Sequence, residues 1–254
     1  MPARRPPAAR GLARRPCEYM FAVSKKLIPG LKCVLDQRTL LLLRNAWARP
    51  VGVVPSDVAT GASVSQLVGL VAASVPDGTK VLTVDNEFTS VTFPFAAQRH
   101  RGVTVKEAKP AELLSQLRGH DLVAVSAVQS GDGAVVDLDD LRNSAQATAA
   151  RVLLDVSQAA GRQPLQLDWA EFVVGAAYKW LLAPRGAAWM AVRSDALADV
   201  VPHVANWFGA EDIWSGLYGL PLRLGGDARR LDLSPAWFSQ HGAASRSRGW
   251  PGSI

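Results

Sequence analysis

Two charged residues, Lys179 and Asp155, have the types and spacing needed to act together on one bound ring. Lys179 follows an apolar run that ends at Ala176, and Asp155, 24 residues upstream, follows another that ends at Leu154. A lysine amine forms a Schiff base with an aldehyde cofactor, and a carboxylate keeps a pyridinium nitrogen protonated, so the ring becomes an electron sink. The pair predicts a pyridoxal phosphate site, with Lys179 as its catalytic residue.

Three further side chains are expected around that ring. Gln158, three residues after Asp155, is placed to donate its amide to the phenolic oxygen of the cofactor. Phe88 follows an apolar run and is expected to stack on the ring. Gln129 or its neighbour Ser130 follows another run and is expected at the polar edge of the ring. The alternatives without a ligand are that Gln158 is a surface glutamine, Phe88 a core residue, and Gln129 or Ser130 a turn residue.

The phosphate group of such a cofactor needs donors, and the segment from Gly61 to Ser65 offers them. Small residues open a helix there, where free backbone N–H groups and the helix dipole attract an anion. Ala62 and Ser63 are the candidate phosphate contacts, although an ordinary helix cap has the same composition. Neither GxGxxG nor GxxxxGK[ST] occurs, which argues against a dinucleotide or Walker-type site.

Strands and helices alternate along most of the chain, which favours an α/β fold. Short apolar runs predict strands, the segments between them predict helices, and successive βα units imply a mainly parallel sheet flanked by helices, with the site at the carboxyl ends of its strands. The expected strands are 80–84, 102–105, 121–125, 151–156, 172–176 and 187–192. The expected helices are 64–74, 90–99, 111–118 and 138–149.

Length and composition indicate one main domain. The chain has 254 residues, 48% hydrophobic and 20% charged, and its apolar runs are far shorter than the roughly 20 residues of a membrane helix. We expect residues 55–237 to form the cofactor-binding large domain. Residues 1–54 are expected to be an atypical, partly disordered segment, and residues 238–254 a loose tail. No membrane span is expected.

The net charge of +6 comes largely from the first 16 residues, which hold five arginines and no acid. Such a leader suits a transit peptide or a nucleic-acid arm, but a disordered start is favoured and no nucleic-acid partner is expected. The two cysteines, Cys17 and Cys33, suit a reduced cytoplasmic location. Because the four histidines show no ligand spacing, no metal is expected.

The ordered motifs from Pro55 to Trp237 resemble the class V aminotransferase family of fold-type I pyridoxal phosphate enzymes, relatives of kynureninases and cysteine desulfurases. Asp155–Gly161 is similar to the family segment Asp-x-x-Gln/His-x-x-Gly, and Ala177–Leu181 to His/Tyr-Lys-Trp/Tyr-Leu. The resemblance implies that Tyr178 contacts the cofactor, and that Ser234 reaches the phosphate of a neighbouring subunit in a homodimer.

The resemblance implies an aminotransferase acting on a small amino acid and a keto acid. Tyr178 and the Asn206–Gly209 segment are also similar to the kynureninase pattern, so a kynureninase-like C–C hydrolase is the first alternative. A cysteine desulfurase is disfavoured because both cysteines lie in the first 33 residues. Family members usually continue into a small carboxyl-terminal domain, which we expect to be largely missing here. A catalytically silent, truncated relative is therefore the second alternative.

Overall fold

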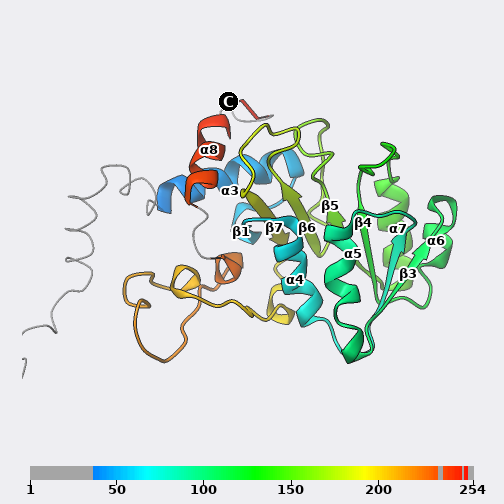
Figure 1. Cartoon of the computed structure of the whole chain (residues 1–254), viewed down its shortest axis with the longest axis horizontal. Coiled ribbons are helices and arrows are strands. Elements are labelled where there is room, and N and C mark those ends of the chain that lie inside the picture. The colour runs from blue at the N-terminus through cyan, green and yellow to red at the C-terminus, as the bar shows by residue number, and fades with distance from the viewer. Residues whose placement is uncertain (1–36, 234–236, 248, 251–254) are drawn as a thin grey trace, which may run out of the picture.

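A computed structural model describes residues 37–233, 237–247 and 249–250 of the chain (Figure 1). The α-helices are α3 (Gln37–Val51), α4 (Val64–Ser74), α5 (Thr89–Ala96), α6 (Leu113–Gln116), α7 (Leu138–Thr148) and α8 (Trp237–Ser247). The strands are β1 (Val58–Gly61), β2 (Lys80–Val84), β3 (Thr104–Ala108), β4 (Leu122–Ser126), β5 (Arg151–Asp155), β6 (Phe172–Ala176) and β7 (Ala188–Val192). Short 3₁₀ helices are η1 (Pro55–Asp57), η2 (Arg99–Arg101), η3 (Pro110–Glu112), η4 (Leu197–Asp199), η5 (Trp207–Gly209) and η6 (Ala228–Leu231).

The strands form one sheet in the order β1-β7-β6-β5-β4-β2-β3. The pairs β2/β3, β2/β4, β4/β5 and β5/β6 are parallel, whereas β7 runs antiparallel to both β6 and β1. The expected mainly parallel sheet is therefore confirmed. Parallel strands end at one edge, so the residues that follow β2, β4, β5 and β6 meet at that edge.

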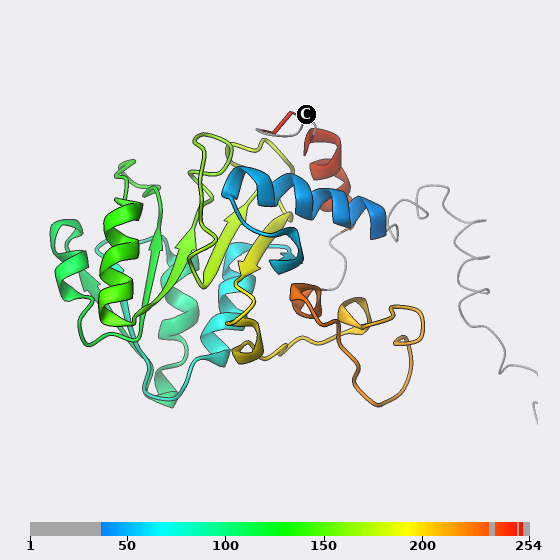
Figure 2. The ribbon, with the colours of Figure 1, turned by 180° about the vertical axis from the view of Figure 1, so that it is seen from behind.

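Helices cover both faces of the sheet. Figures 1 and 2 show α4 and α5 on one face and α3, α6 and α7 on the other. Successive strand side chains point to opposite faces, so Leu154 of β5 packs in the cluster that contains Trp47 of α3, while Leu153 packs in the cluster that contains Leu67 of α4. Each fully buried leucine stabilises the fold by roughly 1.5–3 kcal/mol, and this two-sided core fixes the strand ends.

The expected bounds hold for β2, β6 and α4, and those of most other elements shift by a few residues. Strand β3 differs from the other strands in burial: it lies at an edge of the sheet, and its Thr104, Lys106 and Glu107 are exposed.

Residues 37–51 of the segment before Pro55 form α3, while the expected division of the chain into domains stays a prediction. Leu43 and Trp47 of this helix are fully buried, and the Trp47 ring stacks on Trp189 of β7 with 6.2 Å between centroids. Pro50 near the end of α3 hides its helical pattern in the sequence. Residues 1–36 lie outside the described part of the chain.

Within the segment expected to be a loose tail, residues 238–247 belong to α8 (Trp237–Ser247). Ala243 is fully buried, and Trp250 is only 5% exposed. The Trp250 Nε1–H donates to the carbonyl oxygen of Leu181 at 2.9 Å. The described end of the chain is thus packed against the loop that carries Lys179. None of the helices described has the length and apolar character to cross a membrane.

Candidate functional site

A pocket of about 270 Å³ lies at the carboxyl ends of β5 and β6 and beside the start of α4. Three charged side chains line it, Asp155, Lys179 and Arg185, and serines and small residues make up much of the rest. Its other lining residues are Ala62, Ser63, Val64, Phe88, Ser90, Ser126, Ser130, Ser157, Gln158, Ala176, Tyr178 and Gly186.

Asp155 is the last residue of β5 and only 5% exposed. Its Oδ1 accepts hydrogen bonds from Ser157 N at 2.8 Å and from Ser157 Oγ at 2.6 Å. Ser157 Oγ in turn accepts from Ala176 N, at the end of β6, at 3.0 Å. Within the described chain no donor is bonded to Oδ2. Burial raises the pKa of Asp155 to about 6, with the Ser157 hydrogen bonds acting in the opposite direction.

Lys179 lies in the turn after β6 and is half-buried. Its Nζ is 5.5 Å from the centroid of the Tyr178 ring, and the Arg185 guanidinium carbon is 4.2 Å from the same centroid. One aromatic ring therefore holds two cations at the pocket wall. Neither Lys179 nor Arg185 forms an ion pair with any residue in the described ranges.

The first turn of α4 forms the end of the pocket that suits a phosphate. Ser63 caps the helix, its Oγ accepting from Gln66 N at 3.3 Å, while Ala62 N donates to Gln66 Oε1 at 3.3 Å. The Ser63 hydroxyl hydrogen and the Val64 N–H have no acceptor among the described residues. Helix N-termini bind anions through such donors, and displacing the Gln66 side chain would add Ala62 N.

Phe88 and Gln158 line the pocket as the sequence predicts. Phe88 caps the start of α5 and is 48% exposed, so its ring is accessible to a stacked ligand. Gln158 is half-buried, and its amide has no hydrogen-bond partner in the described part of the protein. Both side chains are thus available to a ligand.

Gln129, by contrast, does not line this pocket. Its Nε2 donates to Glu87 Oε2 at 2.8 Å, and the same buried carboxylate accepts from Ser126 N, Ser126 Oγ and Phe88 N at 2.6–2.7 Å. Glu87 thus holds the Gln129 amide, and the placement of Gln129 at the cofactor stays a prediction. Ser130, the stated alternative, does line the pocket.

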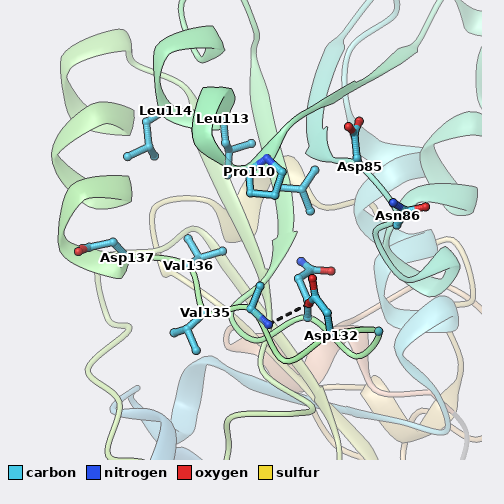
Figure 3. A pocket seen from close by; sticks show the side chains of 13 residues that line it. Asp85, Asn86, Pro110, Leu113, Leu114, Asp132, Val135, Val136 and Asp137 are labelled. Carbon is cyan, nitrogen blue, oxygen red and sulfur yellow. Dashed lines mark hydrogen bonds between the residues drawn. The ribbon is translucent and has the colours of Figure 1, made fainter.

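Gln129 instead lines a larger pocket of about 640 Å³, between α6 and the loop that leads into α7. Figure 3 shows the apolar side chains of Pro110, Leu113 and Leu114 on one side of it and Asp132 on the other. Asp132 Oδ1 accepts from Ala134 N at 2.9 Å. This pocket contains none of the other expected cofactor contacts.

Ser234 lies outside the described residues, so its predicted role stays a prediction. Three groups that surround the expected contacts had not been singled out in the sequence: Arg185, Ser157 and Glu87. The spacing Asp155-Val156-Ser157 is a recognisable Asx-turn pattern, whereas nothing local indicates that Arg185 returns to the pocket. In the described ranges no group of three or more His, Cys, Asp or Glu side chains is arranged to hold a metal ion.

The donor set fits pyridoxal phosphate. Asp155 is a buried carboxylate without a counter-charge in contact, and a protonated ring nitrogen supplies the missing positive partner. Lys179 provides the amine, Ser63 with the start of α4 provides phosphate donors, and Phe88 provides a stacking face. The residues present therefore match the ring nitrogen, the aldehyde and the phosphate of this cofactor.

Comparison with known proteins agrees with this assignment. A family model described as aminotransferase class-V matches residues 59–206. An uncharacterized aminotransferase, YcbU, from Bacillus subtilis (strain 168) is 28% identical over 80% of this chain and 56% of its own length. Isopenicillin N epimerase from Streptomyces clavuligerus is 27% identical over 65% of this chain and 46% of its own length. The chain thus spans about half the length of these relatives.

Solved structures confirm the fold. The cystine C-S lyase C-DES in complex with cysteine persulfide superimposes with a TM-score of 0.76 at 19% identity, covering 91% of this chain and 66% of C-DES. A cysteine desulfurase from Thermococcus onnurineus NA1 gives a TM-score of 0.71 at 19% identity, covering 84% and 56%. A lysine variant of C-DES carries glycine covalently linked to its PLP cofactor, with a TM-score of 0.76 at 19% identity, covering 91% and 65%.

Proposed function

The chain belongs to the class-V aminotransferase family, whose cofactor is pyridoxal phosphate, and from this premise we propose that it is an aminotransferase acting on a small amino acid and a keto acid. The observation that carries the proposal is the convergence of Lys179 and Asp155 on one pocket. The similarity to the aminotransferase YcbU supports amino-group transfer over other reactions of such enzymes.

Each residue has a distinct task in this proposal. Pyridoxal phosphate, when bound, supplies an aldehyde that bonds to amines and a ring that withdraws electrons from the amine-bearing carbon. Asp155 would accept a hydrogen bond from the ring nitrogen and keep it protonated. Ser157 holds Asp155 in place through Oδ1 and leaves Oδ2 without a donor among the described residues. Lys179 Nζ accepts the proton from the α-carbon of the substrate and returns one.

The remaining pocket residues orient and enclose the reactants. Ser63 and the start of α4 would hold the phosphate, Phe88 would cover one ring face, and Gln158 would donate to the phenolic oxygen. We also propose a homodimer, in which Ser234 reaches the neighbouring phosphate, and a cytoplasmic location.

Product analysis tests the activity. Purified protein with added pyridoxal phosphate is incubated with a set of small amino acids and a keto acid, and both products are quantified by chromatography. The proposal predicts equal amounts of a new amino acid and a new keto acid from wild type, and none above background from Lys179→Ala. Because all transfer depends on one amine, the loss should be about 10⁴-fold or more.

The same assay, with kynurenine added to the set of donors, separates the alternatives. Release of alanine from kynurenine without amino transfer would replace the proposal with a kynureninase-like hydrolase. A cofactor-loaded protein that forms neither product from any donor would contradict it in favour of a catalytically silent relative.

A further inference from the structure

Arg185 is the one charged residue of the Lys179 pocket that the proposed function leaves without a task. Lys179 takes the aldehyde and Asp155 takes the ring nitrogen, while Arg185 lines the same pocket. Arg185 is exposed to solvent and has no acidic partner among the described residues, so its guanidinium is free to bind an anion. A cation at the wall of a binding pocket attracts anionic ligands.

Contacts from two sides fix Arg185 in place. Its guanidinium carbon lies 4.2 Å from the centroid of Tyr178, a cation–π contact that orients the flat group at the pocket wall. The carbonyl oxygen of Arg185 accepts a hydrogen bond from Ser239 Oγ of α8 at 2.6 Å. A side chain on Gly186, where φ is +92°, would collide with the same serine. The backbone of Arg185 is thus held by α8 through Ser239.

We propose that Arg185 is an oxyanion-binding residue of this site. The planar guanidinium matches either the carboxylate of the amino-acid substrate or the phosphate of the cofactor, since both present paired anionic oxygens. This inference rests on the proposed function for the identity of the anion, but the binding of an oxyanion to the protein itself does not.

Arg162 offers a matched control. Its guanidinium carbon lies 4.9 Å from the centroid of Trp180, so it makes the same kind of contact with an aromatic ring of the same loop. Arg162 does not line the pocket. Arg162→Gln therefore removes an equivalent charge and stacking contact without touching the proposed anion site.

The first experiment uses protein without cofactor and inorganic phosphate as the probe, measured by isothermal titration calorimetry. Wild type and Arg162→Gln should bind phosphate alike, Arg185→Gln should bind about tenfold more weakly or worse, and Arg185→Lys should fall between them. Equal phosphate binding by wild type and Arg185→Gln, together with unchanged ratios in the second experiment, would overturn the inference. This result does not depend on whether the cofactor binds.

The second experiment identifies the source of the anion by absorbance titration. If Arg185 holds the cofactor phosphate, Arg185→Gln loses affinity for pyridoxal phosphate but not for pyridoxal. If it holds the substrate carboxylate, the loaded variant loses response to alanine but not to ethylamine. Either selective loss supports the inference, and unchanged ratios in both comparisons contradict it. If wild type failed to bind pyridoxal phosphate, that result would instead contradict the proposed function.

Discussion

Asp155 is a buried acid whose pKa is raised to about 6. Its ionised form therefore destabilises the folded protein when no cofactor is bound. The folded protein holds this proton more tightly than the unfolded chain, in which the pKa is 3.8. The stabilising effect of the proton is complete below pH 3.8 and is lost as the pH rises through about 6. The shift corresponds to about 3 kcal/mol.

Asp155→Asn should therefore stabilise the cofactor-free protein at neutral pH. Asparagine keeps an oxygen for the Ser157 hydrogen bonds but carries no charge, so the variant should match wild type at pH 4 and exceed it by about 2–3 kcal/mol at pH 7.5. Urea unfolding at the two pH values measures the difference. An equal effect at both pH values would contradict the account, because a proton-linked effect must change between them.

The pair Gln129 and Ser130 shows what the sequence leaves open at this scale. Both follow β4, and their spacing alone makes either a candidate for the cofactor edge. Glu87, 42 residues before Gln129, accepts a hydrogen bond from the Gln129 amide. Local patterns predict which strand end a residue follows, whereas the choice between neighbours depends on a distant buried charge.

At the scale of elements, α8 braces the loop that carries Lys179. Gly242 of α8 lies against Pro184, Ser239 bonds to the Arg185 carbonyl, and Trp250 bonds to the Leu181 carbonyl. Gln240 Nε2 also donates to the Gly61 carbonyl oxygen, just before the phosphate end of the pocket, at 3.3 Å. One helix thus contacts both sides of the site.

Two glycine variants test this brace. Gly242→Ala places a Cβ in overlap with the rigid Pro184 ring, so α8 must shift, and we expect a loss of about 1–3 kcal/mol. Gly69→Ala, inside α4 with open space around it, should instead gain about 0.5–1 kcal/mol. Chemical denaturation compares the two. Stabilisation by both substitutions would mean that α8 does not pack tightly against Pro184 in the loop that carries Lys179.

The elements that the sequence predicts well are those with a strong local pattern. Continuous apolar runs give β2 and β6 with the observed bounds, and Ser63 marks the start of α4. The missed elements lack such patterns. Helix α3 contains Pro50, β1 has only four residues, and α8 is rich in glycine, serine and alanine. These three depend on tertiary packing against β7 and the Lys179 loop, which no short window of sequence reveals.

At the scale of the whole molecule, the segment between η5 and η6 exposes large apolar side chains. Leu220 is 90% exposed and Leu222 is 64% exposed, and both line one groove of about 260 Å³. Monomeric proteins seldom leave such side chains together in water, which supports the proposed homodimer. We expect this segment to form part of the contact between subunits.

Sedimentation equilibrium tests that expectation. Wild type should sediment as a dimer at micromolar concentration, and Leu220→Ser with Leu222→Ser should raise the dissociation constant about tenfold or more. Val135→Ser, which removes a side chain of equal 64% exposure from another region, should leave the constant unchanged. Wild type that remains monomeric at all concentrations would contradict the homodimer, and an unaffected double variant would place the contact elsewhere.

Reduction with borohydride after cofactor titration shows whether Lys179 and Asp155 hold opposite sides of one pyridoxal phosphate ring. Reduction makes a lysine–cofactor bond permanent, and peptide mass spectrometry locates it. We expect one modified peptide containing Lys179 in wild type, none in Lys179→Ala, and a much weakened titration in Asp155→Asn. Modification of another lysine in wild type, or titration unaffected by Asp155→Asn, would show that the two side chains do not share one ring.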